Sequence, residues 1–261
     1  MSNLSGGEIV GSSGASKRSH SGSLLERHSL EHSKASSRYE PEEEALYDKH
    51  SRNWILVNWV GMGKRVLEVG CSTGYMSRLM QERHCIVTGI EQDAQAAAHA
   101  RDYCQQVHVL DLNSSDWIKE VQAKTFDVVL LGDVLEHLID PRTVLHKFRE
   151  VLDPAGSVVI SLPNVVFWQT RLKILLGRFD YQSCGTLDHT HLRFFTLKTA
   201  RALIESAGYR IVHFHPTLGG RMSGHVRPLW QVLARLMPGL FGFQFLFEAK
   251  PALSRAEHVS F

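Results

Sequence analysis

The sequence predicts an α/β fold built on a doubly wound, mostly parallel sheet. Apolar runs of strand length alternate with helical stretches through most of the chain, which is typical of such a sheet covered on both faces. The first run, residues 65–69, leads into the glycine loop Gly70-Cys71-Ser72-Thr73-Gly74. The second run, residues 86–91, ends at the carboxylate of Glu91. A glycine loop after one strand and an acid at the end of the next are typical of a site that binds a ribose-bearing ligand.

The expected strands follow the apolar runs in order along the chain. They cover residues 65–69, 86–91, 107–110, 127–131, 157–162, 209–215 and 243–249. Continuous rather than alternating apolar character indicates that the first five are buried on both faces. Right-handed crossovers place the loops that follow these strands along one edge, where ligands bind near the switch in strand order.

The expected helices fill the intervals between the strands. They cover residues 41–60, 74–83, 93–105, 114–122, 133–151 with an interruption at Pro141, 164–176, 196–207 and 229–236. Three glutamates at 42–44 suit the positive end of the first helix dipole, and Gly61 and Gly63 end it. Thr196 is a plausible N-cap of its helix, and Gly208 stops that helix.

Composition narrows the class of protein. With 261 residues and 43% hydrophobic content the chain can bury one core, and a net charge of +2 does not indicate a nucleic-acid partner. Four cysteines without Cys-x-x-Cys spacing favour a reducing compartment, which we expect to be the cytoplasm. No apolar leader is visible. Polar and helix-breaking residues interrupt the stretch 229–247, so no transmembrane segment is expected.

The glycine spacing separates two kinds of cofactor. A dinucleotide loop reads Gly-x-Gly-x-x-Gly, and the third glycine is missing here. Glu68, two positions before Gly70, would repel a pyrophosphate but suits a cationic ligand. At this point the sequence resembles the class I S-adenosylmethionine-dependent methyltransferases, whose loop usually reads Glu/Asp-x-Gly-x-Gly-x-Gly, with Ser72 replacing one glycine. The resemblance implies a Rossmann-like sheet with an antiparallel C-terminal edge strand.

The resemblance also implies how S-adenosylmethionine is held. Glu91 accepts the ribose hydroxyls, Asp111 the adenine amino group, and the amide of Leu112 a ring nitrogen. Capping a helix is the alternative role for both acids, and tying the loop is the alternative for Glu68. The implied cofactor-binding set is Glu68, Gly70, Cys71, Gly74, Glu91, Gln92, Asp111, Leu112 and Gly132. Tyr39 and Tyr47 are candidates for an aromatic lid near the sulfonium, with helix packing as the alternative.

The segment after the fourth expected strand, Gly132-Asp133-Val134-Leu135-Glu136-His137-Leu138, resembles that of small-molecule methyltransferases. The Asp/Asn/Ser-Pro-Pro-Tyr/Phe motif of enzymes that methylate base amines is absent, and so is the Pro-Cys pair of 5-methylcytosine enzymes. The expected acceptor is therefore a small molecule or glycan, and no nucleic acid. His137 is a candidate general base because histidine titrates near neutral pH; packing is the alternative.

A second block, Leu187-Asp188-His189-Thr190-His191-Leu192-Arg193-Phe194-Phe195, resembles a bacterial branch of the family. Members of this branch often lie among genes for glycan, other cell-envelope or secondary-metabolite assembly. The resemblance places this loop over the acceptor pocket and favours His191 as the base for O-methylation. The alternative is that the phenylalanines are core and the histidines cap. His-x-His also suggests a metal, but no third ligand stands at a recognisable spacing, so no metal is expected.

The expected organisation is a disordered Ser/Gly/His-rich tail over 1–38, a methyltransferase domain over 39–250 and a flexible C-terminus over 251–261. Acceptor-side insertions are expected around 163–195 and 216–242. The stretch 227–247 is a candidate for peripheral membrane contact. Two alternatives stay open: a protein that binds S-adenosylmethionine or docks a membrane or partner without catalysis, and an NAD-dependent dehydrogenase. The sequence leaves the oligomeric state open.

Overall fold

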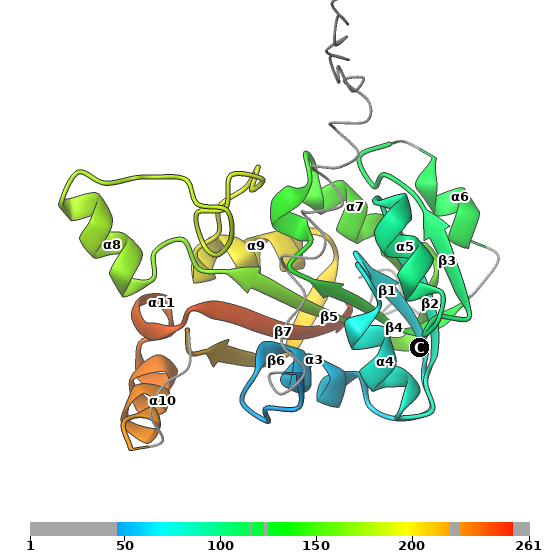
Figure 1. The fold of residues 1–261 in the computed structure, drawn as a ribbon, viewed down its shortest axis with the longest axis horizontal. Coiled ribbons are helices and arrows are strands. Elements are labelled where there is room, and N and C mark those ends of the chain that lie inside the picture. Colours follow the sequence, from blue (N-terminus) through cyan, green and yellow to red (C-terminus); the bar gives the residue numbers. More distant parts are fainter. Residues whose placement is uncertain (1–45, 115, 123–124, 220–224, 253–261) are drawn as a thin grey trace, which may run out of the picture.

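The computed structural model describes residues 46–114, 116–122, 125–219 and 225–252. Seven strands form one sheet in the order β3-β2-β1-β4-β5-β7-β6 (Figure 1). Their bounds are β1 Arg65–Val69, β2 Ile86–Glu91, β3 Gln106–Val109, β4 Phe126–Gly132, β5 Leu152–Pro163, β6 Tyr209–Thr217 and β7 Gln244–Pro251. All pairs from β3 to β5 are parallel, and β7 is antiparallel to both β5 and β6. The predicted fold class is confirmed.

Helices pack against both faces of the sheet. Their bounds are α3 Arg52–Val60, α4 Tyr75–Gln81, α5 Ala94–Ala100, α6 Trp117–Val121, α7 Pro141–Lys147, α8 Trp168–Leu175, α9 Leu197–Ser206, α10 Arg227–Leu236 and α11 Pro238–Phe241, with 3-10 turns η1 Leu135–His137 and η2 Phe148–Glu150. One buried cluster joins the strands to α6, α7 and α9, and a second joins them to α3 and α4. Adjacent strand residues divide between the clusters, as Val66 and Leu67 do, because successive side chains point to opposite faces.

The single helix predicted over residues 41–60 is wrong in its middle. Its first residues lie outside the described part of the chain, and residues 47–50 form a bend and turn rather than a helix. The side chain of Asp48 accepts a hydrogen bond from the amide of His50 at 2.9 Å. Ser51 then caps α3 by accepting from the amide of Trp54 at 3.1 Å. Short polar side chains here bond to nearby backbone amides and so compete with a continuous helix.

Pro141 marks the break expected in the 133–151 stretch. It opens α7 at a position where a helix needs no amide hydrogen, and Asp140 caps the helix by accepting from the amide of Thr143 at 3.1 Å. The expected tail over 1–38 lies outside the described residues, as does most of the segment 251–261. Within the described ranges no helix combines the length and the hydropathy needed to cross a bilayer.

Candidate functional site

A pocket of about 670 Å³ opens where β1, β2 and β4 end. Its lining includes Gly70 after β1, Glu91 at the end of β2 and Gly132 at the end of β4. The strand order reverses between β1 and β4, so this is the switch point at which α/β sheets bind ligands. The volume is within the range of pockets that enclose small-molecule ligands.

The glycine loop keeps the backbone close to its neighbours. Gly70 has φ of 69°, and a Cβ atom there would lie 2.9 Å from Cγ2 of Val134. Ser72 adopts φ of 50°, a left-handed conformation that a glycine reaches at lower cost. Ser72 thus has the backbone conformation that a glycine favours.

Glu91 ties this loop to the end of β2. One carboxylate oxygen accepts from the amide of Ser72 at 2.8 Å, and the other accepts from the amide of Asp93 at 2.9 Å. Each oxygen keeps a second lone pair, and Glu91 lines the pocket together with Gln92. The carboxylate is therefore fixed in orientation and retains capacity to accept two further donors.

The next residues along the edge also line the pocket. Asp111 follows β3, and its side chain accepts from the amide of Asn113 at 2.8 Å. Leu112 lines the pocket beside it. At Gly132 an added Cβ would lie 2.8 Å from Cε of Met76, so this position leaves no room for a side chain.

Three residues of the predicted cofactor set do not line the pocket. Glu68 is 1% exposed and accepts a hydrogen bond from the hydroxyl of Ser77. Burial raises the pKa of its carboxyl well above the usual value. Cys71 is buried, and Gly74 packs against Ala100, where an added Cβ would lie 2.9 Å from Cα. The side chain of Glu68 thus joins β1 to Ser77 of α4, outside the pocket lining.

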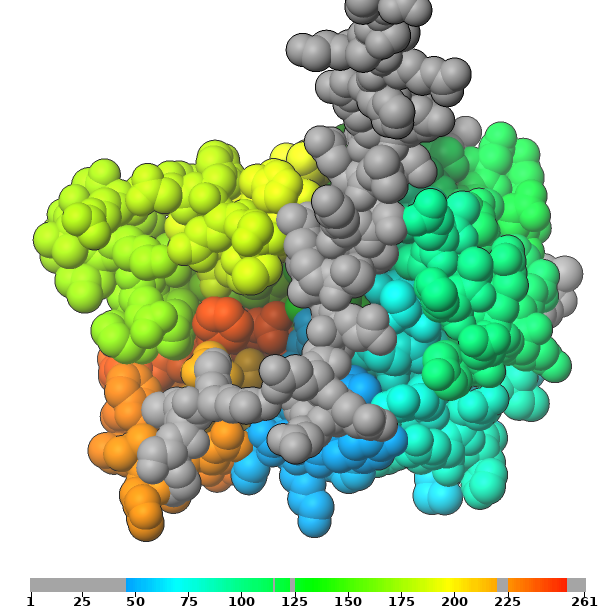
Figure 2. Space-filling model, in the orientation of Figure 1, coloured from blue at the N-terminus to red at the C-terminus, as the bar shows by residue number. Residues whose placement is uncertain are grey.

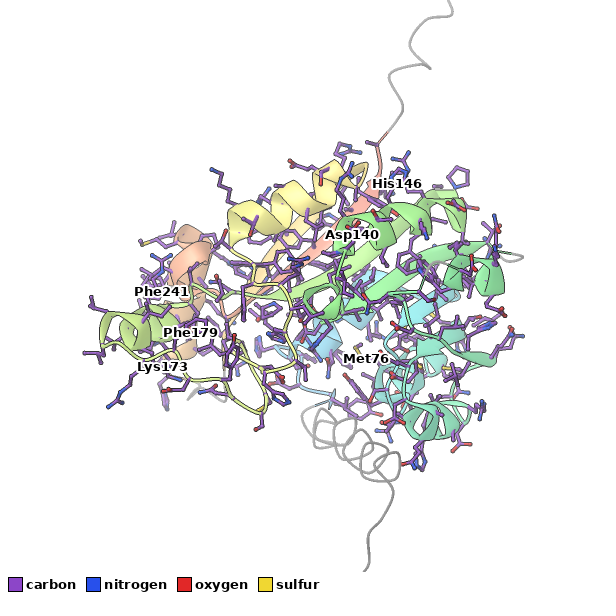
Figure 3. The ribbon with its side chains drawn as sticks, turned by 90° about the horizontal axis from the view of Figure 1, so that it is seen from above. Met76, Asp140, His146, Lys173, Phe179 and Phe241 are labelled. Carbon is purple, nitrogen blue, oxygen red and sulfur yellow. The ribbon has the colours of Figure 1, made fainter. Side chains whose placement is uncertain are left out.

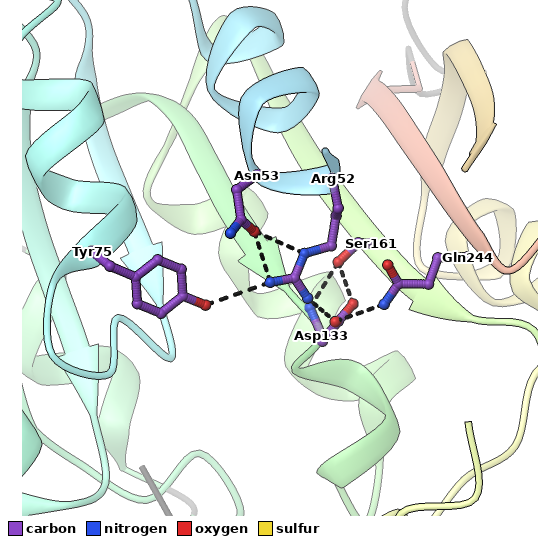
Figure 4. Close-up of polar contacts among 6 residues, drawn as sticks. All are labelled: Arg52, Asn53, Tyr75, Asp133, Ser161 and Gln244. Atoms are coloured by element: carbon purple, nitrogen blue, oxygen red, sulfur yellow. Dashed lines mark hydrogen bonds and ion pairs between the residues drawn. The ribbon is translucent and has the colours of Figure 1, made fainter. Parts of the chain in front are cut away.

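A polar network that the sequence did not identify also borders the pocket (Figure 4). Arg52 of α3 forms an ion pair with Asp133, which follows β4. Gln244 of β7 donates to the same carboxylate at 2.8 Å, and Ser161 of β5 donates its hydroxyl to it. Asp133 has φ of 56°, a conformation that aspartate tolerates better than most residues. Contacts from α3, β5 and β7 thus hold one strained residue in place.

The two candidate bases meet at the other end of the pocket. The rings of His137 and His191 pack edge to face with centroids 4.9 Å apart. Nδ1 of His137 lies 3.2 Å from the carbonyl oxygen of Thr190, and Nδ1 of His191 lies 3.3 Å from that of Thr186. With its Nδ1 proton donated to the carbonyl of Thr186, His191 has Nε2 as the ring nitrogen that can accept a proton. Burial lowers the pKa of His191, and the neighbouring His137 lowers it further.

Glu136 adds a buried carboxyl to this pair. It is 0% exposed and lines the pocket, and neither side-chain oxygen has a hydrogen-bond partner among the described residues. Burial raises the pKa of Glu136 to about 8. Its backbone carbonyl accepts from the amides of Leu192 and Arg193 at 2.8 and 2.9 Å, which ties η1 to the loop that carries His191.

The same three residues form a set of metal-ligand type. Glu136, His137 and His191 each offer one ligand atom, and these atoms lie within 4.8 Å of one another. The His-x-His motif does not supply this arrangement, because His189 is exposed and its ring bonds to the carbonyl of Gln182 instead. Sequence spacing did not reveal this set because Glu136 and His191 are distant along the chain.

The structure does not support an aromatic lid made by Tyr47. Its hydroxyl donates to Glu82 at 2.8 Å and its ring packs on Trp54, so it lies outside the pocket lining. Tyr39 is outside the described residues. Tyr75 of α4 lines the pocket instead. The sequence signal for Tyr75 is its position directly after Gly74, the last residue of the glycine loop.

Comparison with known proteins decides the family. The model of the "Methyltransferase domain" family matches residues 42–214. The chain belongs to the class I S-adenosylmethionine-dependent methyltransferases. Among curated relatives, the ubiquinone biosynthesis O-methyltransferase of Coxiella burnetii (strain RSA 331 / Henzerling II) is 25% identical over 162 residues, which are 59% of this chain and 69% of the relative. That of Aeromonas salmonicida is 26% identical over 182 residues, 64% of this chain and 76% of the relative.

Solved structures share the fold of this methyltransferase. Magnesium protoporphyrin IX methyltransferase from Synechocystis, solved with bound SAH, aligns with a TM-score of 0.58 and 15% identity over 87% of this chain and 97% of that one. A SAM-dependent methyltransferase from Archaeoglobus fulgidus aligns with a TM-score of 0.53 and 18% identity over 80% and 100%. Membership of the family excludes the dehydrogenase alternative.

The residues of this methyltransferase fit its cofactor. S-adenosylmethionine carries no phosphate, and Ser72 stands at the position of the middle glycine that lets the backbone of a dinucleotide loop approach a pyrophosphate. Gly70 and Gly132 line the pocket, and an added Cβ there would collide with Val134 and Met76, so only glycine fits at both positions. Glu91 ends β2 and Asp111 follows β3, and both residues line the pocket.

Proposed function

We propose that this enzyme methylates a hydroxyl of a small-molecule or glycan acceptor. The main observation behind this proposal is that His137 and His191 line the same pocket as Glu91 and the glycine loop. A hydroxyl is a poor nucleophile until its proton is removed, and a positioned base contributes roughly 10²–10⁴-fold. The curated relatives named as O-methyltransferases support an oxygen acceptor.

The cofactor, when bound, supplies a methyl group on a positively charged sulfur. In the proposed arrangement Glu91 accepts the ribose hydroxyls and Asp111 accepts the adenine amino group. The amide of Leu112 donates to a ring nitrogen, and Gln92 lines the same end. The backbones at Gly70 and Gly132 accommodate the methionine end. Glu68, Cys71 and Gly74 shape the loop from outside the pocket lining.

The acceptor end is proposed to lie against the histidines. His191 takes the proton of the acceptor hydroxyl at Nε2, and the carbonyl of Thr186 holds its Nδ1–H. The lowered pKa of His191 keeps the imidazole neutral, and therefore able to accept a proton, at neutral pH. His137 fixes the edge of the His191 ring and is the second candidate base.

An acceptor panel tests this function. Purified enzyme with S-adenosylmethionine is assayed for S-adenosylhomocysteine release against phenols, sugars and amines. We expect turnover on a hydroxyl acceptor, and turnover on amines alone would contradict O-methylation. Cofactor binding by calorimetry without turnover on any class would favour a non-catalytic binding protein.

A chelator separates two roles for the histidine cluster. The proposed base needs no metal, so turnover on the hydroxyl acceptor should survive EDTA. Loss of turnover in EDTA, with recovery on adding a divalent cation, would show instead that Glu136, His137 and His191 serve as metal ligands.

A further inference from the structure

Helices α8, α10 and α11 lie together at one end of the molecule (Figures 1 and 2), and many of the exposed apolar side chains belong to this end. We call residues 168–181 and 226–237 the α8–α10 face. It holds eleven of the seventeen exposed large hydrophobic side chains among the described residues. Leu175 is 82% exposed and Leu236 is 74% exposed. Concentration of this kind marks a surface that binds something, since scattered apolar residues are the norm elsewhere.

The two segments of this face are held together. Trp168 of α8 stacks on Trp230 of α10 with ring centroids 5.9 Å apart. Arg171 donates to the carbonyl of Gly239 in α11 at 3.2 Å. Figure 3 shows Lys173, Phe179 and Phe241 at this end, away from Asp140 and His146. These contacts place α8 beside α10 and α11, so the exposed leucines of two sequence-distant helices lie at the same end of the molecule.

The charges on the face have one predominant sign. Arg171, Lys173 and Arg178 stand against a single acid, Asp180, in its first segment. The second segment carries Arg227 and Arg235 and no acid. The charge of Arg227 is partly compensated, because its guanidinium lies 3.9 Å from the carboxylate of Asp48. Exposed apolar side chains with cations beside them match a lipid bilayer with acidic headgroups. The apolar side chains contact the acyl layer, and the cations contact the anionic headgroups.

A second copy of the chain fits this face less well. A symmetric dimer would place the same patch on both sides of the interface, so the excess of arginine and lysine would face itself. Like charges brought together repel, and the cost rises as water is excluded. An anionic lipid surface supplies the opposite charge together with the apolar layer.

The face leads directly to the pocket. Tyr181 packs on Phe179 with centroids 5.9 Å apart, and Phe179 packs on Phe194 at 6.2 Å. Phe194 in turn packs on His191 at 6.3 Å. An unbroken path of aromatic rings therefore joins the exposed surface to one of the histidines of the pocket.

We propose that the α8–α10 face docks on an anionic lipid bilayer and presents the histidine end of the pocket to the membrane surface. The described helices do not span a bilayer, so the contact is interfacial. The proposal extends the candidate stretch 227–247 to α8 and the loop that follows it. It does not depend on which acceptor is methylated.

Vesicle co-sedimentation of the purified full chain tests this docking. We expect binding to phosphatidylglycerol/phosphatidylcholine vesicles that is at least tenfold stronger than binding to phosphatidylcholine alone and that weakens with salt. The double variant Leu175→Glu/Leu236→Glu should lose at least tenfold in affinity for the acidic vesicles. Both leucines are exposed, so its melting temperature should match that of the wild type.

Met62→Glu is the matched control, because Met62 is an exposed apolar side chain, 67% exposed, outside the face. It should sediment with the vesicles as the wild type does. Equal losses in the control and the double variant would overturn the proposal, as would equal binding to neutral and acidic vesicles. Concentration-dependent dimerisation that the double variant abolishes, without vesicle binding by the wild type, would assign the face to a second copy instead.

Discussion

Arg52 and Asp133 form an ion pair inside the pocket although 81 residues separate them in the chain. The pair joins α3 to the residue that follows β4, and Gln244 of β7 donates to the same carboxylate. Three segments that are remote in sequence therefore meet at one side chain. Because the carboxylate is 23% exposed and the guanidinium 20%, solvent screens part of their attraction.

We expect Asp133→Asn to destabilise the enzyme modestly and Asp133→Ala to destabilise it more. Asparagine keeps the left-handed backbone accessible, so this variant loses the ion pair and leaves Arg52 without its carboxylate partner, a cost of about 1 kcal/mol. Alanine adds strain at φ of 56°. About 1 kcal/mol corresponds to roughly 2–4 °C in melting temperature for a domain of this size. Thermal melts in low salt measure both, and equal melting temperatures for the two variants would contradict the strain argument.

Glu91→Ala should weaken binding of S-adenosylhomocysteine at least tenfold. The variant removes the proposed acceptor for the ribose hydroxyls and also frees the amides of Ser72 and Asp93, which Glu91 holds at 2.8 and 2.9 Å. Loss of charge-assisted hydrogen bonds of this kind costs roughly 1.5–3 kcal/mol. Titration calorimetry measures the dissociation constant.

Glu120→Ala on the exposed side of α6 is the matched control and should bind as the wild type does. A circular dichroism spectrum checks that Glu91→Ala keeps its fold. An unchanged dissociation constant in that folded variant would remove the ribose assignment.

The sheet could be predicted from the sequence because each central strand is a continuous apolar run. Residues 65–69 and 86–91 have the bounds that the pattern predicts. Glu91 stood out for the same reason, since it ends such a run beside a glycine loop. An apolar run and the acid at its end are local features of the sequence. The topology then places the ends of such strands at the switch point.

The Arg52–Asp133 pair and the Glu136 cluster could not be found this way. Arg52 lies on a helix before the first strand, and no motif links it to a residue after the fourth. Glu136 and His191 meet only because the loop 185–195 folds back over η1, where two amides bond to the carbonyl of Glu136. The position of such a loop depends on tertiary packing, for which the sequence carries no periodic signal.

His191→Ala should lower turnover on a hydroxyl acceptor by roughly 10²-fold or more while leaving cofactor affinity within twofold. The acting form is the neutral imidazole, and burial lowers the pKa of His191 from its usual 6.5. Turnover of the wild type should therefore rise with pH through a limb below pH 6.5 and then level. Initial rates across pH 5 to 8 record that limb, which the variant should lack.

His189→Ala serves as the control, since His189 is an exposed neighbour whose side chain does not line the pocket. Its pH profile should match that of the wild type. If His191→Ala keeps both the rate and the limb, His191 is structural, and the same measurement on His137→Ala then tests the second candidate.

Glu136→Gln should stabilise the fold, by an amount that grows as the pH rises from 4.5 to about 8. The unfolded chain releases the Glu136 proton near the usual value of 4.5, whereas burial holds it in the folded protein up to about pH 8. The unfolded state then binds fewer protons across this window, so the stability of the wild type falls as pH rises and levels off above it. Glutamine has a similar shape and no charge, which removes this loss; one pKa unit corresponds to about 1.4 kcal/mol. Chemical denaturation at pH 5, 6.5 and 8.5 measures the difference.

Glu120→Gln, at an exposed position, is the control and should show the pH dependence of the wild type. An equal gain from Glu136→Gln at all three pH values would mean that the carboxyl is not held protonated by burial.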